Sequence, residues 1–294
     1  MDMIVLFSIV ALLTSIIATF FSISFFNKKN LFVQKPNNRS SHSTPTPSGG
    51  GIIFFLISWT IITIFLFFLD NPEFIRVSFL VLLPIPVFAR SLIDDFKEVS
   101  AKTRLIIQII SAILAIFFIQ KISNISIDIF FTIIAILIIV WMTNLYNFID
   151  GINGYAAFGA SITLMALFFY TNESSFIILA FAIFGFLIFN IKGLIFMGDS
   201  GSATLGFMFG LLMVYFFTIG NYKALVCEII LLAPFIFDAT YTLIKRFLRG
   251  ENILKPHKEH IFQKLAVKWN SHFAVTLMLF AYQLLVLIAA RLFL

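Results

Sequence analysis

The sequence is divided into long, uninterrupted apolar runs that are separated by short polar stretches. A membrane-spanning helix needs roughly 20 consecutive, mostly apolar residues. Windows of that size give ten candidate spans, which are residues 3–26, 49–69, 75–90, 104–120, 128–145, 155–170, 175–190, 203–219, 224–244 and 273–293. Because the runs are continuous rather than alternating, they favour helices over the strands of a membrane barrel. The sequence therefore predicts an all-α, polytopic integral membrane protein with about ten transmembrane helices in one domain, residues 1–294.

The composition excludes a water-soluble fold. Hydrophobic residues make up 61% of the chain and charged residues 12%, whereas a soluble globular chain is usually about 45–50% apolar and about a quarter charged. Too few polar side chains remain to cover a water-facing surface. The one cysteine, Cys227, also excludes an internal disulfide framework.

The basic residues predict the orientation in the membrane. Five loops carry 16 of the 20 Lys and Arg residues, namely 27–48, 90–104, 146–154, 191–202 and 245–272. The positive-inside rule places these loops in the cytoplasm and both termini outside. The net charge of +6 is therefore read as a topology signal, with no nucleic-acid partner expected. The first apolar run lacks a small-residue cleavage pattern, so it is expected to be an anchor rather than a cleaved signal peptide.

The first of these loops has groups suited to a phosphorylated ligand. Arg39 can bind phosphate oxygens through a planar fork of donors, and His42 follows it closely. The three consecutive glycines Gly49–Gly51 let the backbone approach a ligand closely. The alternative interpretation is an ordinary basic loop beside the membrane with a flexible hinge.

The second loop contains the adjacent acids Asp94 and Asp95, followed by Lys102. Two like charges about 4 Å apart repel by about 4 kcal/mol at an effective dielectric constant near 20. A divalent cation would offset that repulsion. Neighbouring side chains on a helix point about 100° apart, so both acids serve one site only if the backbone bends there. Otherwise they have separate roles, and a solvated charge cluster is a third interpretation.

The third loop has no Lys or Arg, which is unusual for a cytoplasmic connection. It offers the amides of Asn144, Asn147 and Asn153, the carboxylate of Asp150 and two glycines. These groups suit recognition of a sugar, a base or metal-bound water. A simple turn built from Asn, Asp and Gly is the alternative.

The fourth loop opens the eighth span with the sequence Gly198-Asp199-Ser200-Gly201-Ser202. Ser200 or Ser202 can cap the helix, and its free backbone N–H groups are expected to bind an anion. Asp199 would then hold a metal ion against that anion. A plain N-cap between two turn glycines is the alternative.

The fifth loop contains His257 and His260, which share a face if the segment is helical. Ile261, Leu265 and Trp269 then form an apolar stripe. A basic amphipathic segment lying on anionic lipid headgroups explains the same pattern.

A transporter or flippase of a lipid-linked or anionic substrate is the competing functional class. Transporters place polar groups near the middle of the bilayer, commonly on broken helices. The expected spans are almost free of charge apart from Asp238 and Glu228. Asp238 is either a functional group or half of a buried pair.

Taken in order, the five loops resemble the polyprenyl-phosphate N-acetylhexosamine-1-phosphate transferase family, the glycosyltransferase 4 family. The likeness covers nearly the whole chain. Its ending, His257-Lys-Glu-His260-Ile-Phe-Gln, is similar to the O-antigen-initiating branch and lacks the triple-histidine run of the peptidoglycan translocase. Two positions depart from the family pattern: Asn153 stands where a second acid is usual, and Ser48 where a basic residue often precedes the glycines.

The resemblance implies an enzyme with its active site on the cytoplasmic face of a bacterial inner membrane. Such an enzyme transfers an N-acetylhexosamine-1-phosphate from a UDP-sugar to undecaprenyl phosphate and releases UMP. The sugar would be a 6-deoxy sugar such as FucNAc or QuiNAc, or GlcNAc, and the product would initiate O-antigen, lipopolysaccharide or other cell-envelope glycan synthesis. The expected partners are UDP-N-acetylhexosamine, undecaprenyl phosphate and membrane lipids, with a homodimer as an open alternative to a monomer.

The resemblance also assigns roles to residues of this chain. Mg²⁺ is the expected cofactor, with Mn²⁺ as a substitute, and the expected metal ligands are Asp199 and Asp94. The expected catalytic acids are Asp94, Asp95 and Asp199; one of the adjacent pair would orient the lipid phosphate or form a phosphoryl-enzyme. The expected substrate-binding residues are Arg39, His42, Lys102, Asn147, Asp150, Asn153, His257 and His260.

Overall fold

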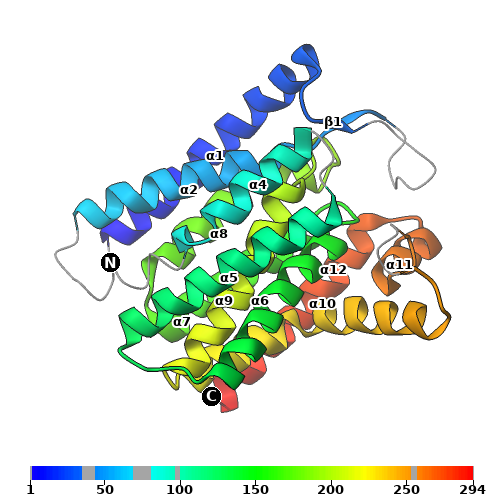
Figure 1. Cartoon of the computed structure of the whole chain (residues 1–294). Coiled ribbons are helices and arrows are strands. Elements are labelled where there is room, and N and C mark those ends of the chain that lie inside the picture. Colours follow the sequence, from blue (N-terminus) through cyan, green and yellow to red (C-terminus); the bar gives the residue numbers. More distant parts are fainter. Residues whose placement is uncertain (1, 35–43, 69–80, 97–99, 253–256, 294) are drawn as a thin grey trace.

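The computed structural model describes residues 2–34, 44–68, 81–96, 100–252 and 257–293. These residues form an all-helical bundle with one very small strand pair (Figure 1). Two-residue strands β1 (Val33–Gln34) and β2 (Thr46–Pro47) pair antiparallel. The helices are α1 (Asp2–Lys29), α2 (Gly50–Phe67), α4 (Ile85–Phe96), α5 (Ala101–Ser123), α6 (Ile129–Ile149), α7 (Tyr155–Thr171), α8 (Ser174–Asn190), α9 (Asp199–Thr218), α10 (Tyr222–Leu248), α11 (Ile261–Trp269) and α12 (His272–Phe293).

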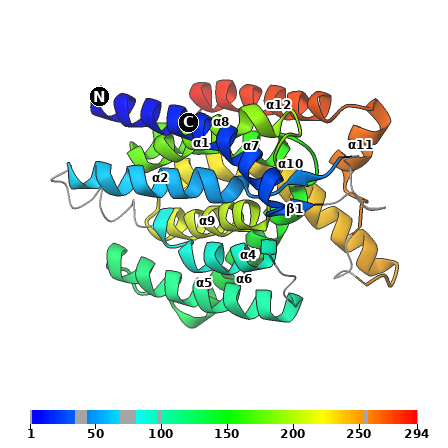
Figure 2. The same ribbon diagram turned by 90° about the horizontal axis from the view of Figure 1, so that it is seen from above.

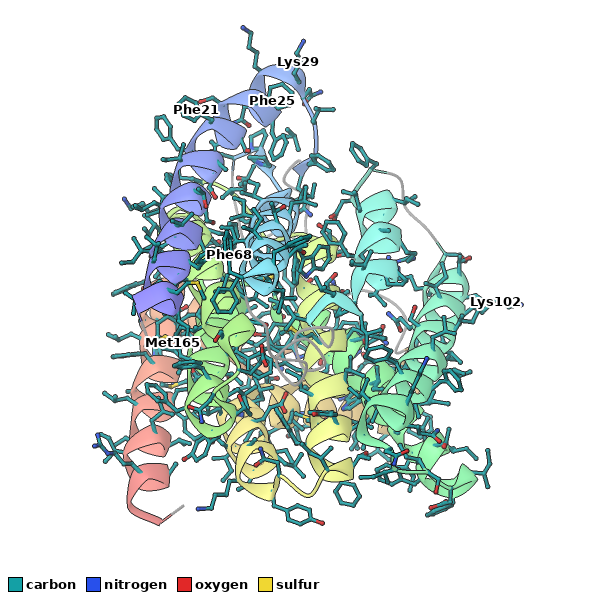
Figure 3. The ribbon with its side chains drawn as sticks, turned by 90° about the vertical axis from the view of Figure 1, so that its left-hand side faces the viewer. Phe21, Phe25, Lys29, Phe68, Lys102 and Met165 are labelled. Atoms are coloured by element: carbon teal, nitrogen blue, oxygen red, sulfur yellow. The ribbon has the colours of Figure 1, made fainter. Side chains whose placement is uncertain are left out.

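The helices confirm the prediction of a polytopic all-α membrane protein. Among the described residues, seven helices are long and apolar enough to cross a membrane, and α7 and α8 are shorter apolar helices. Side chains such as Phe21 and Phe25 point outward from α1 (Figure 3), as expected for a surface that faces lipid. Nine of the ten expected spans coincide with a described helix within a few residues. The third, 75–90, lies partly outside the described residues, and its described part continues as α4 to Phe96.

Successive long helices run in opposite directions, so that the polar loops gather at one end of the bundle. We call this the site end; it carries β1, β2, the end of α4, the start of α9 and all of α11, and both chain termini lie away from it (Figure 1). The described parts of the five loops expected in the cytoplasm therefore share one end of the molecule.

Helix α9 occupies the centre of the bundle. Viewed from above, it is surrounded by α2, α4, α6 and α10 (Figure 2), and 89% of its most apolar window is buried. Gly206 and Gly210 let it approach α6 closely, because a Cβ at either position would meet backbone atoms of that helix. The first residue of this central helix, Asp199, is consequently fixed by contacts on several sides.

The glycine run at the start of α2 places that helix against the start of α9. The N–H of Gly51 donates to the Met197 carbonyl at 2.8 Å. A Cβ at Gly51 would lie 2.2 Å from the backbone nitrogen of Gly201. The glycines thus serve helix packing at the site end, through contact between two backbones.

The substitution Gly51→Ala is expected to lower the free energy of unfolding by more than about 3 kcal/mol, because the obstructing atoms are backbone and relax poorly. Gly220→Ala is the matched control. Its φ of +72° is strained for alanine, but no atom lies within 4 Å of the new Cβ, so it should lose only about 1–2 kcal/mol. Thermal unfolding of both variants in detergent measures the difference, and equal losses would contradict the packing role of Gly51.

Candidate active site

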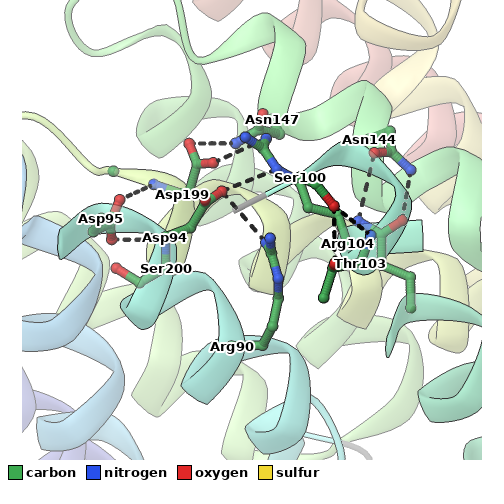
Figure 4. Close-up of polar contacts among 12 residues, drawn as sticks. Arg90, Asp94, Asp95, Ser100, Thr103, Arg104, Asn144, Asn147, Asp199 and Ser200 are labelled. Carbon is green, nitrogen blue, oxygen red and sulfur yellow. Dashed lines mark hydrogen bonds and ion pairs between the residues drawn. The ribbon is translucent and has the colours of Figure 1, made fainter. Parts of the chain in front are cut away.

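An ion-pair network joins α4, α5, α6 and α9 at the site end (Figure 4). The Arg104 guanidinium lies between two acids: its Nε is 3.0 Å from Asp94 Oδ2, and its Nη1 is 3.4 Å from Asp199 Oδ2. Asn147 donates from Nδ2 to Asp199 Oδ1 at 3.0 Å and to Ser202 Oγ at 2.9 Å. The Asp199 carboxylate is therefore oriented by an amide on one oxygen and a cation on the other.

Asp95 has a different role from its neighbour. Its two carboxylate oxygens accept hydrogen bonds from the backbone N–H groups of Asp199, at 2.9 Å, and Ser200, at 3.1 Å. A carboxylate at a helix N-terminus satisfies donors that have no partner within the helix and complements the helix dipole. Asp95 thus caps α9 from α4 and fixes the position of Asp199.

These contacts correct two expectations for the start of α9. The N-cap residue is Gly198, and no side chain of the loop caps the helix, so the prediction of capping by Ser200 or Ser202 is wrong. The first N–H groups are not free for an anion either, because Asp95 already accepts from them. Local sequence could not reveal this, since the acceptor comes from a residue about a hundred positions away.

The acids and amides expected in loops lie in the last turns of helices. Asp94 and Asp95 belong to α4, and Asn144 and Asn147 belong to α6. Because the α4 backbone is helical there, the two acids point in different directions, which confirms the alternative of separate roles. Asn144 pairs with Gln108 of α5, to which its Nδ2 donates at 2.8 Å.

Burial affects the ionisation of two acids near the network. It raises the pKa of Asp95, which lies beyond the expected span 75–90, to about 7, although the hydrogen bonds from Ser200 and Asp199 act in the opposite direction. Burial also raises the pKa of Asp150, just after the end of α6, well above its ordinary value, and the charges of Asp199 and Asp95 add to this rise.

A cavity of about 1280 Å³ opens beside the network. One part of its wall is acidic and amide-rich and contains Asn147, Asp150, Asn153 and Asp199. The structure therefore brings together four of the residues predicted to form the site. The cavity is large enough for a nucleotide-sized ligand, since ordinary small-molecule sites measure about 300–1,000 Å³.

Another part of the cavity wall is basic. Lys258, Lys264 and Lys268 line it, together with uncharged polar residues that include Asn270 and His272. These residues belong to α11 and its flanking segments. The cavity thus has an acidic wall and a basic wall, which suits a ligand that carries negative charge together with a cation.

Helix α11 is attached to the bundle by Asp238 of α10. The Asp238 carboxylate accepts from the backbone N–H groups of Ile261 and Phe262, both at 2.9 Å, and contacts His260 Nδ1 at 3.2 Å. Asp238 is therefore half of a buried pair, the second of the two roles left open for it. By capping α11 it also positions the basic wall of the cavity.

The two histidines of this segment do not lie on a helix, because α11 begins only at Ile261. His260 is 2% exposed and is not among the residues that line the cavity. The His257 ring is half-buried and lies against it in a tilted arrangement, with a centroid distance of 4.8 Å. The buried face of α11 consists of Phe262 and Ala266 rather than the expected stripe, since α11 packs against α10 and α12 on that side.

One carboxylate of the site fits a divalent cation. Among the described residues, no group of three or more His, Cys, Asp and Glu side chains is arranged to hold a metal ion. Mg²⁺ usually keeps several waters and takes one or two carboxylates together with substrate phosphates. Asp199, which lines the cavity, meets that requirement. Asp94, the other predicted ligand, has a side chain only 3% exposed and is covered by guanidinium groups.

Comparisons with known proteins show which family the chain belongs to. Residues 77–217 match the family model described as glycosyl transferase family 4. The chain is 30% identical over 257 residues to the undecaprenyl-phosphate alpha-N-acetylglucosaminyl 1-phosphate transferase of Thermotoga maritima, covering 85% of this chain and 79% of that relative. The chain belongs to the glycosyl transferase 4 family.

Two further members are similar over most of their length. A probable undecaprenyl-phosphate N-acetylglucosaminyl 1-phosphate transferase of Bacillus subtilis is 30% identical, covering 82% of this chain and 71% of the relative. The phospho-N-acetylmuramoyl-pentapeptide-transferase of Thermotoga neapolitana is 28% identical, covering 66% and 69%. The chain is therefore a member of the polyprenyl-phosphate hexosamine-1-phosphate transferase family, as its five loops predicted.

The remaining predicted residues of this family member lie elsewhere or outside the described part. Arg39 and His42 fall outside the described residues. Lys102 is exposed on the first turn of α5 and points away from the bundle (Figure 3). Arg104, two residues further on, makes the contacts with the acids instead. Sequence reasoning missed Arg104, although residues two apart on a helix face different sides and only one of the two cations could point inward.

Proposed function

We propose that this transferase moves an N-acetylhexosamine-1-phosphate from a UDP-sugar to undecaprenyl phosphate and releases UMP. The observation that carries the proposal is the cavity at the site end, in which Asp199 and Asn147 lie on one wall and lysines on the other. The relatives named above act on undecaprenyl phosphate, according to their names. A transporter is not favoured, because the similar proteins are transferases.

The basic wall suits the donor diphosphate. Charge neutralisation dominates the barrier when a lipid phosphate approaches a diphosphate, since both reactants are anionic. Lys258, Lys264 and Lys268 already line the cavity, so their positive charge is in place before the diphosphate binds. The uncharged polar groups of Asn153, Asn270 and other lining residues leave room for hydrogen bonds to sugar hydroxyls.

The acidic wall suits a divalent cation, with Asp199 as its protein ligand. A bound Mg²⁺ or Mn²⁺ would neutralise charge on the diphosphate and on the leaving UMP. Asn147 holds one Asp199 oxygen, so the carboxylate keeps a single orientation. Arg104, in contact with the other Asp199 oxygen, is a second source of positive charge beside this carboxylate.

The adjacent acids Asp94 and Asp95 do not line the cavity, but they stabilise the residues around Asp199. Asp95 fixes the start of α9, and Asp94 holds Arg104. Asp150 lines the cavity and is placed to contact a nucleotide or sugar. Their roles as base or nucleophile toward the lipid phosphate remain predictions from the family resemblance.

The proposed location is a bacterial inner membrane, with the site end in the cytoplasm. Sixteen of the 20 basic residues belong to the five loops whose described parts lie at this end, and the positive-inside rule assigns these loops to the cytoplasm. The prenyl tail then stays in lipid while the sugar nucleotide arrives from the cytosol. Within this reaction class we propose initiation of O-antigen or a related envelope glycan, with a 6-deoxy-N-acetylhexosamine or GlcNAc as the sugar; a homodimer stays an untested prediction.

The test is to incubate the protein in membranes with undecaprenyl phosphate and a panel of labelled UDP-N-acetylhexosamines. We expect at least one donor to yield a lipid-linked sugar diphosphate and an equal amount of UMP. Exhaustive chelation with EDTA should stop both, and added Mg²⁺ should restore them. Absence of UMP release with every donor would contradict the proposal, and undiminished turnover after chelation would remove the metal from it.

A further inference from the structure

Asp94 has two guanidinium neighbours that differ in burial. Arg90, one helical turn earlier on α4, places Nη1 3.4 Å from Asp94 Oδ2, and its side chain is 8% exposed. Arg104 of α5 places Nε 3.0 Å from the same oxygen, and its side chain is 36% exposed. Figure 4 shows both guanidinium groups directed at Asp94. One cation is enclosed in the bundle, and the other is partly exposed and contacts Asp199, which lines the cavity.

The two arginines also differ in what else they contact. Arg104 is divided between Asp94 and Asp199, the acid that lines the cavity. Arg90 reaches Asp94, while two of its nitrogens, Nε and Nη2, are buried without a hydrogen-bond partner among the described residues; in Arg104 this holds for Nε alone. Buried donors without a partner are unfavourable and call for an explanation. A network built only for stability would satisfy more of the donors of Arg90.

The burial of Asp94 supplies the explanation. Its side chain is 3% exposed, so an Asp94 carboxylate without a counter-charge would be strongly unfavourable. If Arg104 were its principal counter-charge, Arg104 could not leave it for another anion. Arg90 is fixed at an i, i+4 position on the same helix and therefore stays beside Asp94 whatever Arg104 does.

We propose that Arg90 is a positioning residue that keeps Asp94 neutralised, so that Arg104 can exchange Asp94 for the diphosphate of the donor nucleotide. This inference rests on the proposed function, since it assumes that a nucleotide diphosphate enters the cavity beside Asp199. Arg104 then places its positive charge beside the diphosphate of the substrate. Asp94, the acid that Arg104 leaves, keeps Arg90 as its partner.

The test compares UDP binding, in the presence of Mg²⁺, by the unaltered protein and by the variants Arg90→Met, Arg90→Lys and Arg90→Met/Asp94→Asn. Isothermal titration calorimetry gives the Kd of UDP, and thermal unfolding gives stability. Arg90→Met should raise the Kd about tenfold, because Arg104 must then stay with Asp94. Arg90→Lys should stay within about threefold of the unaltered protein. The double variant should bind UDP more tightly than Arg90→Met, because no buried carboxylate is left to hold Arg104.

Lys121→Met is the matched control, because it removes an exposed cation at the far end of α5; its Kd should not change. A folded Arg90→Met protein with an unchanged Kd would overturn the inference, and so would an Arg90→Lys protein as weak as Arg90→Met. If Arg90→Met does not fold, Asp94→Asn and the double variant must bind UDP equally, and a difference would overturn it. Failure of the unaltered protein to bind UDP would instead overturn the proposed function itself.

Discussion

Asp199→Asn should reduce sugar-phosphate transfer about a thousandfold, which is the size of effect seen when one preorganised electrostatic group is removed from an active site. Asparagine keeps the shape of the side chain and one oxygen, but it removes the negative charge that would hold a cation. The start of α9 should be retained, because the backbone N–H groups that Asp95 accepts from are unchanged. The measurement is UMP release in membranes that contain equal amounts of the two proteins.

Asp128→Asn is the matched control for this prediction. Asp128 caps α6 at the end of the bundle opposite the site, where it accepts from the N–H of Phe131. Asparagine is nearly as good a cap as aspartate, so transfer should be unaffected. Asp199→Asn with full activity would refute the role of Asp199 as the metal-holding acid, and an equal loss in both variants would point to damage unrelated to the site.

Asp238→Ala is expected to have the second largest effect. It removes the acceptor for the N–H groups of Ile261 and Phe262 and the partner of His260. Each buried polar group left unsatisfied is unfavourable by about 1–3 kcal/mol, so α11 should detach from α10 and the basic wall of the cavity should be lost with it. We expect a lower unfolding midpoint and a KM for the UDP-sugar raised at least about tenfold.

Thr242→Val provides the comparison for Asp238. The Thr242 hydroxyl donates to the same carboxylate at 3.1 Å, and within the described part of the chain it has no hydrogen bond to α11. Removal of this hydroxyl should lower the free energy of unfolding by about 1 kcal/mol and leave the KM for the UDP-sugar unchanged. An Asp238→Ala protein that folds and keeps its KM would contradict the role of Asp238 in positioning the cavity wall.

The length and continuity of the apolar runs were sufficient to predict the helical bundle. Nine of the ten spans were found within a few residues, because burial of backbone polar groups in lipid leaves a helix as the only structure for an isolated apolar run. The clustering of the five loops at one end follows from the alternation of spans, and it brought Asn147, Asp150, Asn153 and Asp199 to one cavity as expected. The boundaries were less reliable: Asp94 and Asn147 lie inside helices, since a span can continue past its last apolar residue when neighbours satisfy the polar side chains.

Only the tertiary structure decided which partner each charged residue has. Asp95 caps a helix more than a hundred residues away, Asp238 holds α11, and Arg104 rather than Lys102 reaches Asp199. All three are contacts between helices distant in sequence, and their geometry depends on how each helix is rotated about its axis. Rotation is set by packing against several neighbours at once, whereas the order and direction of the spans are set by each segment's own affinity for the bilayer. The sequence therefore determined the bundle and its polar end, and the packing of α9 against α4, α5 and α6 determined the chemistry available there.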